Sequence, residues 1–159
     1  MLTDLFIGLE AAHVRYVLIG GMAVNLHGVP RSTFDIDLAV SFDEDNLRRF
    51  WEYMLSVGFK PRQPVTLQQF LQPAMREDWR VHKHMLAITF VVESPFWLEV
   101  DVLLDLAGMT FEELQADSCR IPMKDISIPV AGIDSLIHMK LAAGREQDLC
   151  DVEVLRRLQ

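Results

Sequence analysis

The chain has 159 residues, of which 50% are apolar and 24% are charged. This length predicts one globular domain over residues 1–159, which can bury a core without disulfides or a structural metal. Lys and Arg number 15 and Asp and Glu number 23, so the net charge of −8 argues against bulk binding of DNA or RNA. The chain has no apolar run of membrane-helix length and no basic N-terminal segment, so we expect no membrane partner and a cytoplasmic location.

The first part of the chain is expected to alternate between helix and strand. The predicted elements are a helix over 2–13, a strand over 15–19, a helix over 22–27, a strand over 34–40 and a helix ending near residue 56. Gly20 and Gly21 separate the first strand from the second helix. Asp43 or Asp45 is expected to cap the third helix, which Gly58 stops.

The second part begins with a polar, proline-containing segment, residues 60–82, for which we predict a loop with one short helix. The elements expected after it are two strands of a hairpin over 84–92 and 97–104, a helix opened by Thr110, a strand over 126–130, and helices over 135–143 and 146–158. Pro129 predicts that its strand lies at a sheet edge. This order favours an α+β fold, a mixed β-sheet flanked by helices.

Gly20 and Gly21 stand between a buried strand and a helix. Glycines at such a point allow the backbone to approach an anion closely, and the start of a helix offers unpaired N–H groups. The pair therefore indicates a phosphate site. The alternative is an ordinary tight turn between strand and helix.

Asp35 and Asp37 flank Ile36 in an otherwise apolar strand, so the strand period places both carboxylates on one face. Phe34, Ile36 and Leu38 would fill the opposite face and enter the core. Two like charges about 7 Å apart repel by about 2 kcal/mol at an effective dielectric of about 20, and a divalent cation such as Mg²⁺ reverses that sign. The alternative is the solvated face of an edge strand.

Glu99 and Asp101 repeat this pattern on the second strand of the predicted hairpin. If that strand lies beside residues 34–40, one of its acids completes a cluster of three carboxylates. Such a cluster holds two Mg²⁺ ions in the arrangement used for phosphoryl and nucleotidyl transfer. The alternative is a solvent-facing acidic pair.

Two segments together resemble a known superfamily. The string YVLIGGMAVNLHGVPRSTFDIDLAV, residues 16–40, is similar to the signature of nucleotidyltransferases with the DNA polymerase beta-like fold. The tail LIHMKLAAGREQDLCDVEVL, residues 136–155, is similar to the last helices of minimal nucleotidyltransferases, which include bacterial antitoxins and AbiEii-type toxins. The resemblance implies a nucleotidyltransferase-type mixed sheet flanked by helices.

The resemblance also implies roles for the residues that match its motifs. Asp35, Asp37 and Asp101 would bind a two-metal Mg²⁺ site, with Asp101 as the candidate general base. The nucleotide would be bound by six residues, namely Gly20, Gly21, Arg31, Thr33, Lys140 and Arg145. Asp148 and Asp151 would orient Lys140 and Arg145, or would lie on an ordinary exposed helix face.

Two positions depart from the superfamily pattern. Met22 replaces a serine whose hydroxyl would contact phosphate, and Gln147 stands where relatives often have a basic residue. Both departures bear on turnover and substrate rather than on fold.

The leading hypothesis is a Mg²⁺-dependent transferase that moves NMP from an NTP to a hydroxyl of a protein or RNA acceptor, with a toxin or antitoxin protein as a candidate partner. The alternative is a noncatalytic binding module of the same fold, such as a toxin–antitoxin subunit. A phosphatase with Asp35 as nucleophile ranks last, because Ala39 replaces the Thr or Ser of that motif.

Overall fold

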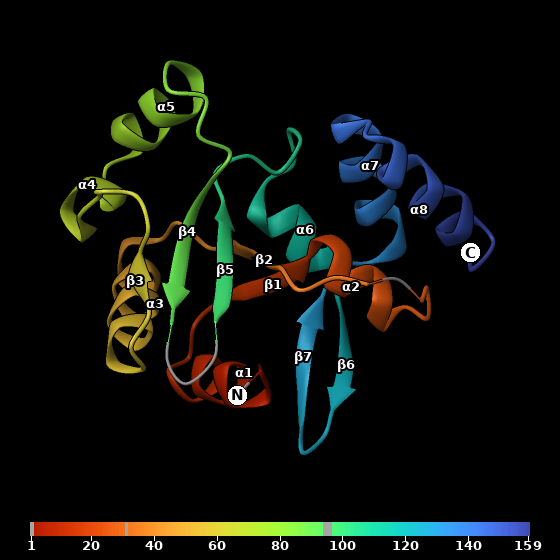
Figure 1. The fold of residues 1–159 in the computed structure, drawn as a ribbon, viewed down its shortest axis with the longest axis horizontal. Coiled ribbons are helices and arrows are strands. Elements are labelled where there is room, and N and C mark those ends of the chain that lie inside the picture. Colours follow the sequence, from red (N-terminus) through yellow and green to blue (C-terminus); the bar gives the residue numbers. More distant parts are fainter. Residues whose placement is uncertain (1, 31, 94–96) are drawn as a thin grey trace.

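The computed structural model describes residues 2–30, 32–93 and 97–159. Seven strands form one mixed sheet flanked by helices, which confirms the predicted α+β class (Figure 1). In order across the sheet, the strands are β3 (Lys60–Pro61), β4 (Ala87–Val92), β5 (Leu98–Leu103), β2 (Ile36–Val40), β1 (Tyr16–Ile19), β7 (Ile126–Val130) and β6 (Cys119–Met123). β2 runs antiparallel to β1 and parallel to β5.

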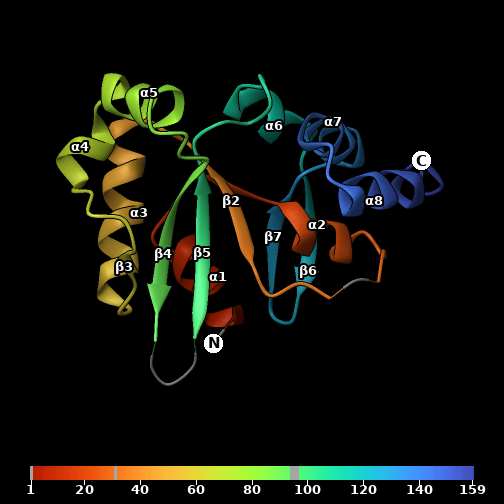
Figure 2. The same cartoon turned by 45° about the horizontal axis from the view of Figure 1, so that its top comes forward.

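Helices lie at both ends of this sheet and against its middle (Figures 1 and 2). They are α1 (Leu2–Ala11), α2 (Gly20–Leu26), α3 (Glu44–Ser56), α4 (Leu67–Leu71), α5 (Pro73–Val81), α6 (Phe111–Asp117), α7 (Ile133–Ala143) and α8 (Glu146–Arg156). Helices α3 to α5 lie near β3 and β4, whereas α7 and α8 lie beyond α2 at the other end (Figures 1 and 2). α2 packs against β1, β2 and α7. None of the helices in the described ranges is both long and apolar enough to cross a bilayer.

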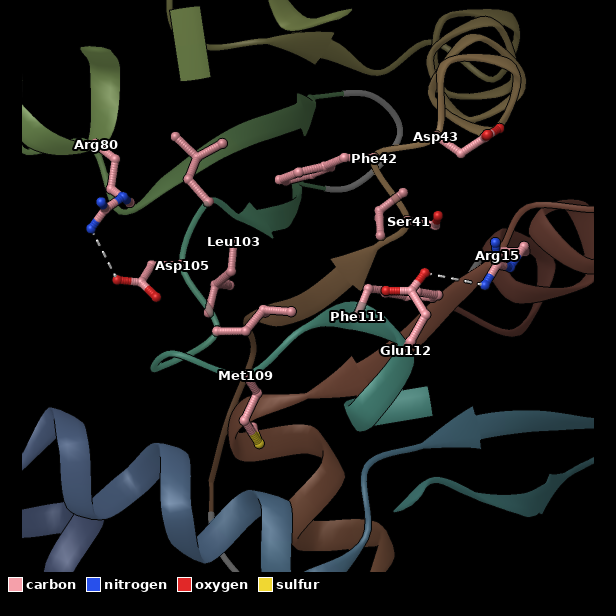
Figure 3. Close-up of a pocket in the computed structure, with 13 residues that line it drawn as sticks. Arg15, Ser41, Phe42, Asp43, Arg80, Leu103, Asp105, Met109, Phe111 and Glu112 are labelled. Atoms are coloured by element: carbon pink, nitrogen blue, oxygen red, sulfur yellow. Dashed lines mark hydrogen bonds and ion pairs between the residues drawn. The ribbon is translucent and has the colours of Figure 1, made fainter. Parts of the chain in front are cut away.

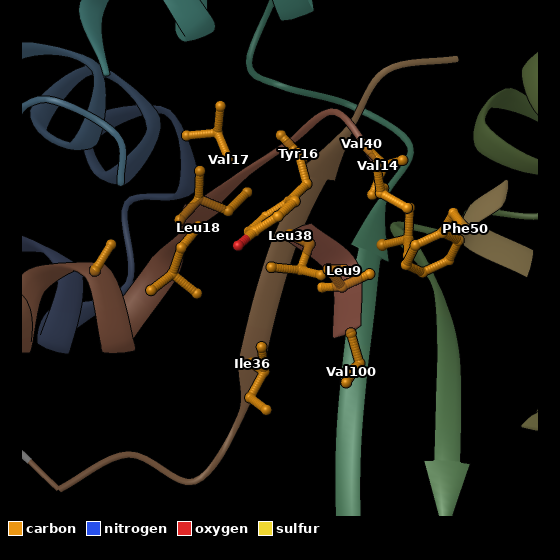
Figure 4. Close-up of a cluster of buried hydrophobic side chains, with 14 of the residues drawn as sticks. Leu9, Val14, Tyr16, Val17, Leu18, Ile36, Leu38, Val40, Phe50 and Val100 are labelled. Carbon is orange, nitrogen blue, oxygen red and sulfur yellow. The ribbon is translucent and has the colours of Figure 1, made fainter. Parts of the chain in front are cut away.

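The core forms around β1, whose four residues are all buried. Figure 4 shows side chains of β1, β2 and β5 meeting those of α1 and α3. The Phe6 ring of α1 stacks on Tyr16 with ring centroids 5.9 Å apart, and the Phe50 ring of α3 meets Phe90 edge-on at 5.3 Å. Burial on both faces explains why residues 16–19 are a continuous apolar run rather than an alternating one.

Helix starts are set by local hydrogen bonds that the sequence also predicts. The Asp43 side chain caps α3 by accepting a hydrogen bond from the Asn46 N–H. Thr110 caps α6 through a capping box with Glu113. Both positions agree with the sequence-based prediction.

The prediction of a loop with one helix over residues 60–82 is wrong. This segment contains β3, α4 and α5. Thr66 opens α4 with a capping box to Gln69, and Pro73 occupies the first turn of α5, where a missing N–H costs nothing. The prolines therefore mark element starts rather than a long loop.

Two further predictions are corrected at strand ends. Phe34 is 87% exposed rather than buried, because β2 begins only at Ile36. β7 is not an edge strand, since it lies between β1 and β6, and Pro129 is tolerated because β7 pairs with β1 only at Leu18 and Val130. The edge is instead β6, which the sequence analysis did not identify. The turn predicted at 93–95 falls largely outside the described residues.

Candidate functional site

Three neighbouring strands bring polar side chains together at one level of the sheet. Asp37 of β2 is in register with Asp101 of β5, and Asp101 is in register with Thr89 of β4. Neighbouring strands lie about 4.8 Å apart, and in-register residues project from the same face. The parallel pairing of β2 with β5 therefore places two acids that are distant in the sequence side by side.

The diglycine turn is shaped around one of these acids. β1 ends beside Asp37, because Ile19 and Asp37 are in register. Gly20 has a φ of +67°, and a Cβ at this position would lie 2.0 Å from Asp37 Oδ2. Only glycine fits both the left-handed backbone and this close approach. The Gly21 N–H also donates a hydrogen bond to the Asp37 carboxylate, so the turn first serves to hold that side chain.

Burial raises the pKa of Asp37 to about 6, and the adjacent Asp101 and Asp35 carboxylates contribute to the rise. The Arg145 charge and the Gly21 hydrogen bond act in the opposite direction without cancelling it. The carboxylate of Asp37 therefore sits where its negative charge is poorly compensated.

Asp101 is in a similar environment. Burial raises its pKa, and its Oδ1 atom is buried with no hydrogen-bond partner. Glu99, two residues earlier, is instead engaged by Arg62 and by the Trp97 indole, whose Nε1 donates a 2.7 Å hydrogen bond. Trp97 itself is 58% exposed.

These acids line one cavity of about 290 Å³, which we call the acid cavity. Its lining combines the diglycine turn, the predicted acids and the α7–α8 region, namely Gly20, Gly21, Thr33, Asp35, Asp37, Asp101, Lys140, Arg145, Gln147 and Asp148. Asp35 lies on the loop before β2 and is exposed. The predicted phosphate contact from Arg31 lies outside the described residues. Every other residue predicted for the site lines this cavity.

The α7–α8 part of the cavity lining is a buried ion network. Lys140 Nζ lies 3.0 Å from Asp148 Oδ1 and 2.6 Å from Asp151 Oδ2, and all three side chains are less than 10% exposed. Arg145 Nε lies 2.7 Å from the other oxygen of Asp148. Asp148 and Asp151 thus hold Lys140 and Arg145 in place, and the alternative of an ordinary exposed helix face is wrong.

In this network, the cost of burying Asp148 is opposed by its two basic partners. Burial alone would raise the pKa of Asp148, but hydrogen bonds from Arg145 and Lys140 outweigh it and hold the pKa below its usual range. Lys140 is committed to two carboxylates, whereas the Arg145 side chain is 79% exposed. Arg145 is therefore the more available positive charge at the cavity.

A divalent cation fits the chemistry of this donor set. Within residues 2–30, 32–93 and 97–159, no three His, Cys, Asp or Glu side chains form a ready-made set of metal ligands. Asp37 and Asp101 nevertheless stand adjacent with raised pKa values, and one buried oxygen of Asp101 lacks a partner. Hard cations such as Mg²⁺ prefer carboxylate oxygens of this kind.

A larger cavity of about 490 Å³ lies at the opposite ends of β2 and β5 (Figure 3). Its charged side chains are already paired, with Arg15 3.7 Å from Glu112 and Arg80 3.5 Å from Asp105. This cavity contains none of the residues predicted for the site.

Thr89 and Gln147 were not predicted as site residues. Thr89 reaches the site only through the register of β4 with β5, which the sequence does not specify. Gln147 was noted only as a departure from a pattern, yet it lines the acid cavity and donates a 3.1 Å hydrogen bond to Asp151 Oδ1.

Comparison with known proteins supports the fold. No protein-family model and no curated protein matches the chain. Among solved structures, the lincosamide antibiotic adenylyltransferase LnuA with bound lincomycin aligns with a TM-score of 0.60 and 20% identity, over 99% of this chain and 96% of that one. A Thermotoga maritima protein assigned as a nucleotidyltransferase aligns with a TM-score of 0.57 and 15% identity, over 98% and 88% of the chains.

An antigenic nucleotidyltransferase-like protein from Paracoccidioides brasiliensis aligns with a TM-score of 0.61 and 17% identity, over 97% of this chain and 73% of that one. The chain therefore has the fold of nucleotidyltransferases, as the resemblance implied. The narrower resemblance to minimal nucleotidyltransferases and AbiEii-type toxins stays a prediction.

Proposed function

We propose that this chain transfers a nucleoside monophosphate from an NTP to a hydroxyl group of an acceptor, with Mg²⁺ as cofactor. The observation that carries the proposal is the acid cavity, where Asp35, Asp37 and Asp101 line one wall and two of them have raised pKa values. LnuA is an adenylyltransferase, so ATP is the first nucleotide to test.

Asp35, Asp37 and Asp101 would hold the metal, because Asp148, the other acid of the cavity, is already paired with Lys140 and Arg145. Bound Mg²⁺ offsets the repulsion among these carboxylates and neutralises charge that develops on the phosphates. Arg145, whose side chain is 79% exposed, supplies a further positive charge for a phosphate group.

In the proposed step, the acceptor oxygen attacks the α-phosphorus and forms a new P–O bond. The bond from the α-phosphorus to the oxygen bridging it to the β-phosphate breaks, and pyrophosphate leaves with that oxygen. The acceptor proton passes to the carboxylate of Asp101, which lines the acid cavity. Its raised pKa brings this base nearer to the working pH.

The test follows label from each α-labelled NTP into acceptors of a cell lysate, with and without Mg²⁺. Changing Asp35 and Asp37 to Ala together should lower transfer at least about 10³-fold, because the metal loses two of its three ligands. The control variant Glu112→Gln alters a carboxylate in the larger cavity and should keep wild-type transfer.

Two results would reject the proposal. One is transfer that persists in the double Asp variant at the wild-type rate. The other is folded wild-type protein that labels nothing with any NTP, which is the result expected of a noncatalytic toxin–antitoxin subunit.

A further inference from the structure

We infer that the acceptor is a small, mainly apolar molecule with a hydroxyl group, and that it lies in a groove leading to the acid cavity along α7. This inference rests on the proposed function and names its substrate class. The groove has a volume of about 400 Å³ and runs between β5 and α7. Leu86, Leu103, Met139, Ala142 and Ala143 form its apolar lining, and we call it the apolar groove.

A smaller hollow of about 130 Å³, which we call the passage, shares lining residues with both the apolar groove and the acid cavity. Gly20 and Asp37 line both the passage and the acid cavity. Leu103, Met139 and Ala143 line both the passage and the groove. A molecule lying in the groove can therefore extend one end to the carboxylates where transfer would occur.

Arg145 lines the acid cavity, the passage and the groove. Its guanidinium is anchored by Asp148, with Nε 2.7 Å from Asp148 Oδ2, while most of the side chain stays exposed. The residue thus marks the junction at which a nucleotide phosphate and an acceptor hydroxyl would meet.

The outer wall of the groove is held in place. The loop after β5 lies beside α7 (Figure 1), and His138 Nε2 on α7 donates a 2.9 Å hydrogen bond to the Ala107 carbonyl of this loop. Ala107 also lines the groove. A preformed, mostly apolar hollow of this volume with few polar groups is typical of small-molecule sites.

The charges of the groove disfavour RNA. An RNA acceptor needs several basic side chains to neutralise its phosphates, but Arg145 is the one basic residue among the described lining of the groove. Asp105 also lines the groove, and its charge is matched by Arg80 at 3.5 Å. The passage is also too small to admit more than the tip of a folded protein.

The experiment supplies α-labelled ATP, Mg²⁺ and a cell lysate split into a low-mass filtrate and a macromolecular retentate. Wild-type protein should label a compound in the filtrate. Ala143→Trp, which fills the inner groove, should lower this labelling at least about tenfold while ATP affinity stays unchanged. Ala142→Trp repeats the test at a position that lines the groove but not the passage.

The matched control is Leu141→Trp, which adds the same side chain to the same helix at an exposed position outside the groove lining. It should label like the wild type. Label in the retentate would overturn the inference and leave the proposed function standing. Label in the filtrate that neither Ala variant reduces would overturn the assignment of the groove. An absence of label in both fractions would reject the proposed function itself.

Discussion

The two cavities at opposite ends of β2 differ in how their charges are matched. In the larger cavity, Arg15 and Arg80 each lie within ion-pair distance of an acid, and Asp43 accepts the capping hydrogen bond of α3. In the acid cavity, Asp37 and Asp101 stand side by side, and burial raises the pKa of both.

This difference shows that volume does not identify the functional site. The larger cavity gains stability from its charges, whereas the acid cavity carries a folding cost that a bound cation would remove. Sites that bind charged ligands commonly keep such a cost, because residues selected for binding are not optimal for folding.

The largest expected effect on stability comes from the ion network of the acid cavity. Lys140→Met removes the ammonium between Asp148 and Asp151 and leaves two buried carboxylates without their main counter-charge. We expect the free energy of unfolding, measured in urea, to fall by about 3–5 kcal/mol. Arg48→Met breaks the exposed ion pair with Glu44 and should cost less than about 1 kcal/mol. Equal losses in free energy of unfolding in the two variants would show that the buried network stabilises the protein no more than an exposed ion pair does.

Asp37→Asn is expected to raise the free energy of unfolding, whereas Lys140→Met lowers it. The pKa of Asp37 rises from 3.8 to about 6 on folding, which corresponds to about 3 kcal/mol of cost once the group is ionised in both states. The folded state is therefore favoured below pH 4 and loses this advantage as the pH rises through 6. Asp37→Asn should be more stable than wild type at pH 8 by up to about 3 kcal/mol.

That gain should disappear below about pH 4, because Asp37 is then neutral in both states. Thermal unfolding across pH measures the difference. Glu52→Gln, an exposed carboxylate on α3, serves as the control and should show no pH-dependent gain. A constant difference between Asp37→Asn and wild type at every pH would contradict the electrostatic explanation.

Addition of Mg²⁺ should offset the free-energy cost of burying the ionised Asp37 carboxylate. At a concentration 100-fold above its Kd, the ion should stabilise the wild type by about 2.7 kcal/mol at pH 8. The effect should shrink as the pH falls through about 6, because protonated Asp37 is a poor ligand. Asp101→Asn should weaken it, and Glu112→Gln in the larger cavity should not. Equal stabilisation of all three proteins by Mg²⁺ would place the ion elsewhere.

A smaller loss of stability is expected in the diglycine turn. Variants there distinguish its backbone conformation from its placement of Asp37. Gly20→Ala should cost about 1–2 kcal/mol from its left-handed backbone, and its Cβ would also displace Asp37. Gly28→Ala has a positive φ as well, but open space around its Cβ. Both variants should lose stability, and only Gly20→Ala should lose the stabilisation by Mg²⁺. Loss in both would indicate a general effect of the backbone.

The smallest effect is expected in the larger cavity. Arg15→Met removes an ion pair with Glu112 and a contact of the guanidinium with the Phe111 ring at 5.2 Å. Because the pair is partly exposed, the free energy of unfolding should fall by less than about 1 kcal/mol. Transfer activity should be unchanged. A loss of transfer would mean that the larger cavity belongs to the functional site.

Much of the fold was predictable because its signals are local. Asp43 and Thr110 cap helices through hydrogen bonds to residues three positions later, and the alternation around Asp37 marks a strand. The errors arose where tertiary contacts decide. β6 contains Arg120 and Pro122 and forms by pairing with β7, while Phe34 is exposed because β2 starts two residues after it.

The sequence by itself determined the diglycine turn, the paired acids at 35 and 37 and the α+β order of elements, because each depends on residues close together along the chain. The choice of the later acid came from the family resemblance, which implied Asp101, and from the tertiary structure, which places it. The register of β2 with β5 places Asp101, rather than Glu99, beside Asp37. The packing of α7 on α8 buries Lys140 between two carboxylates, and the gap between β5 and α7 forms the apolar groove. Register and packing depend on contacts among distant segments, which no local pattern encodes.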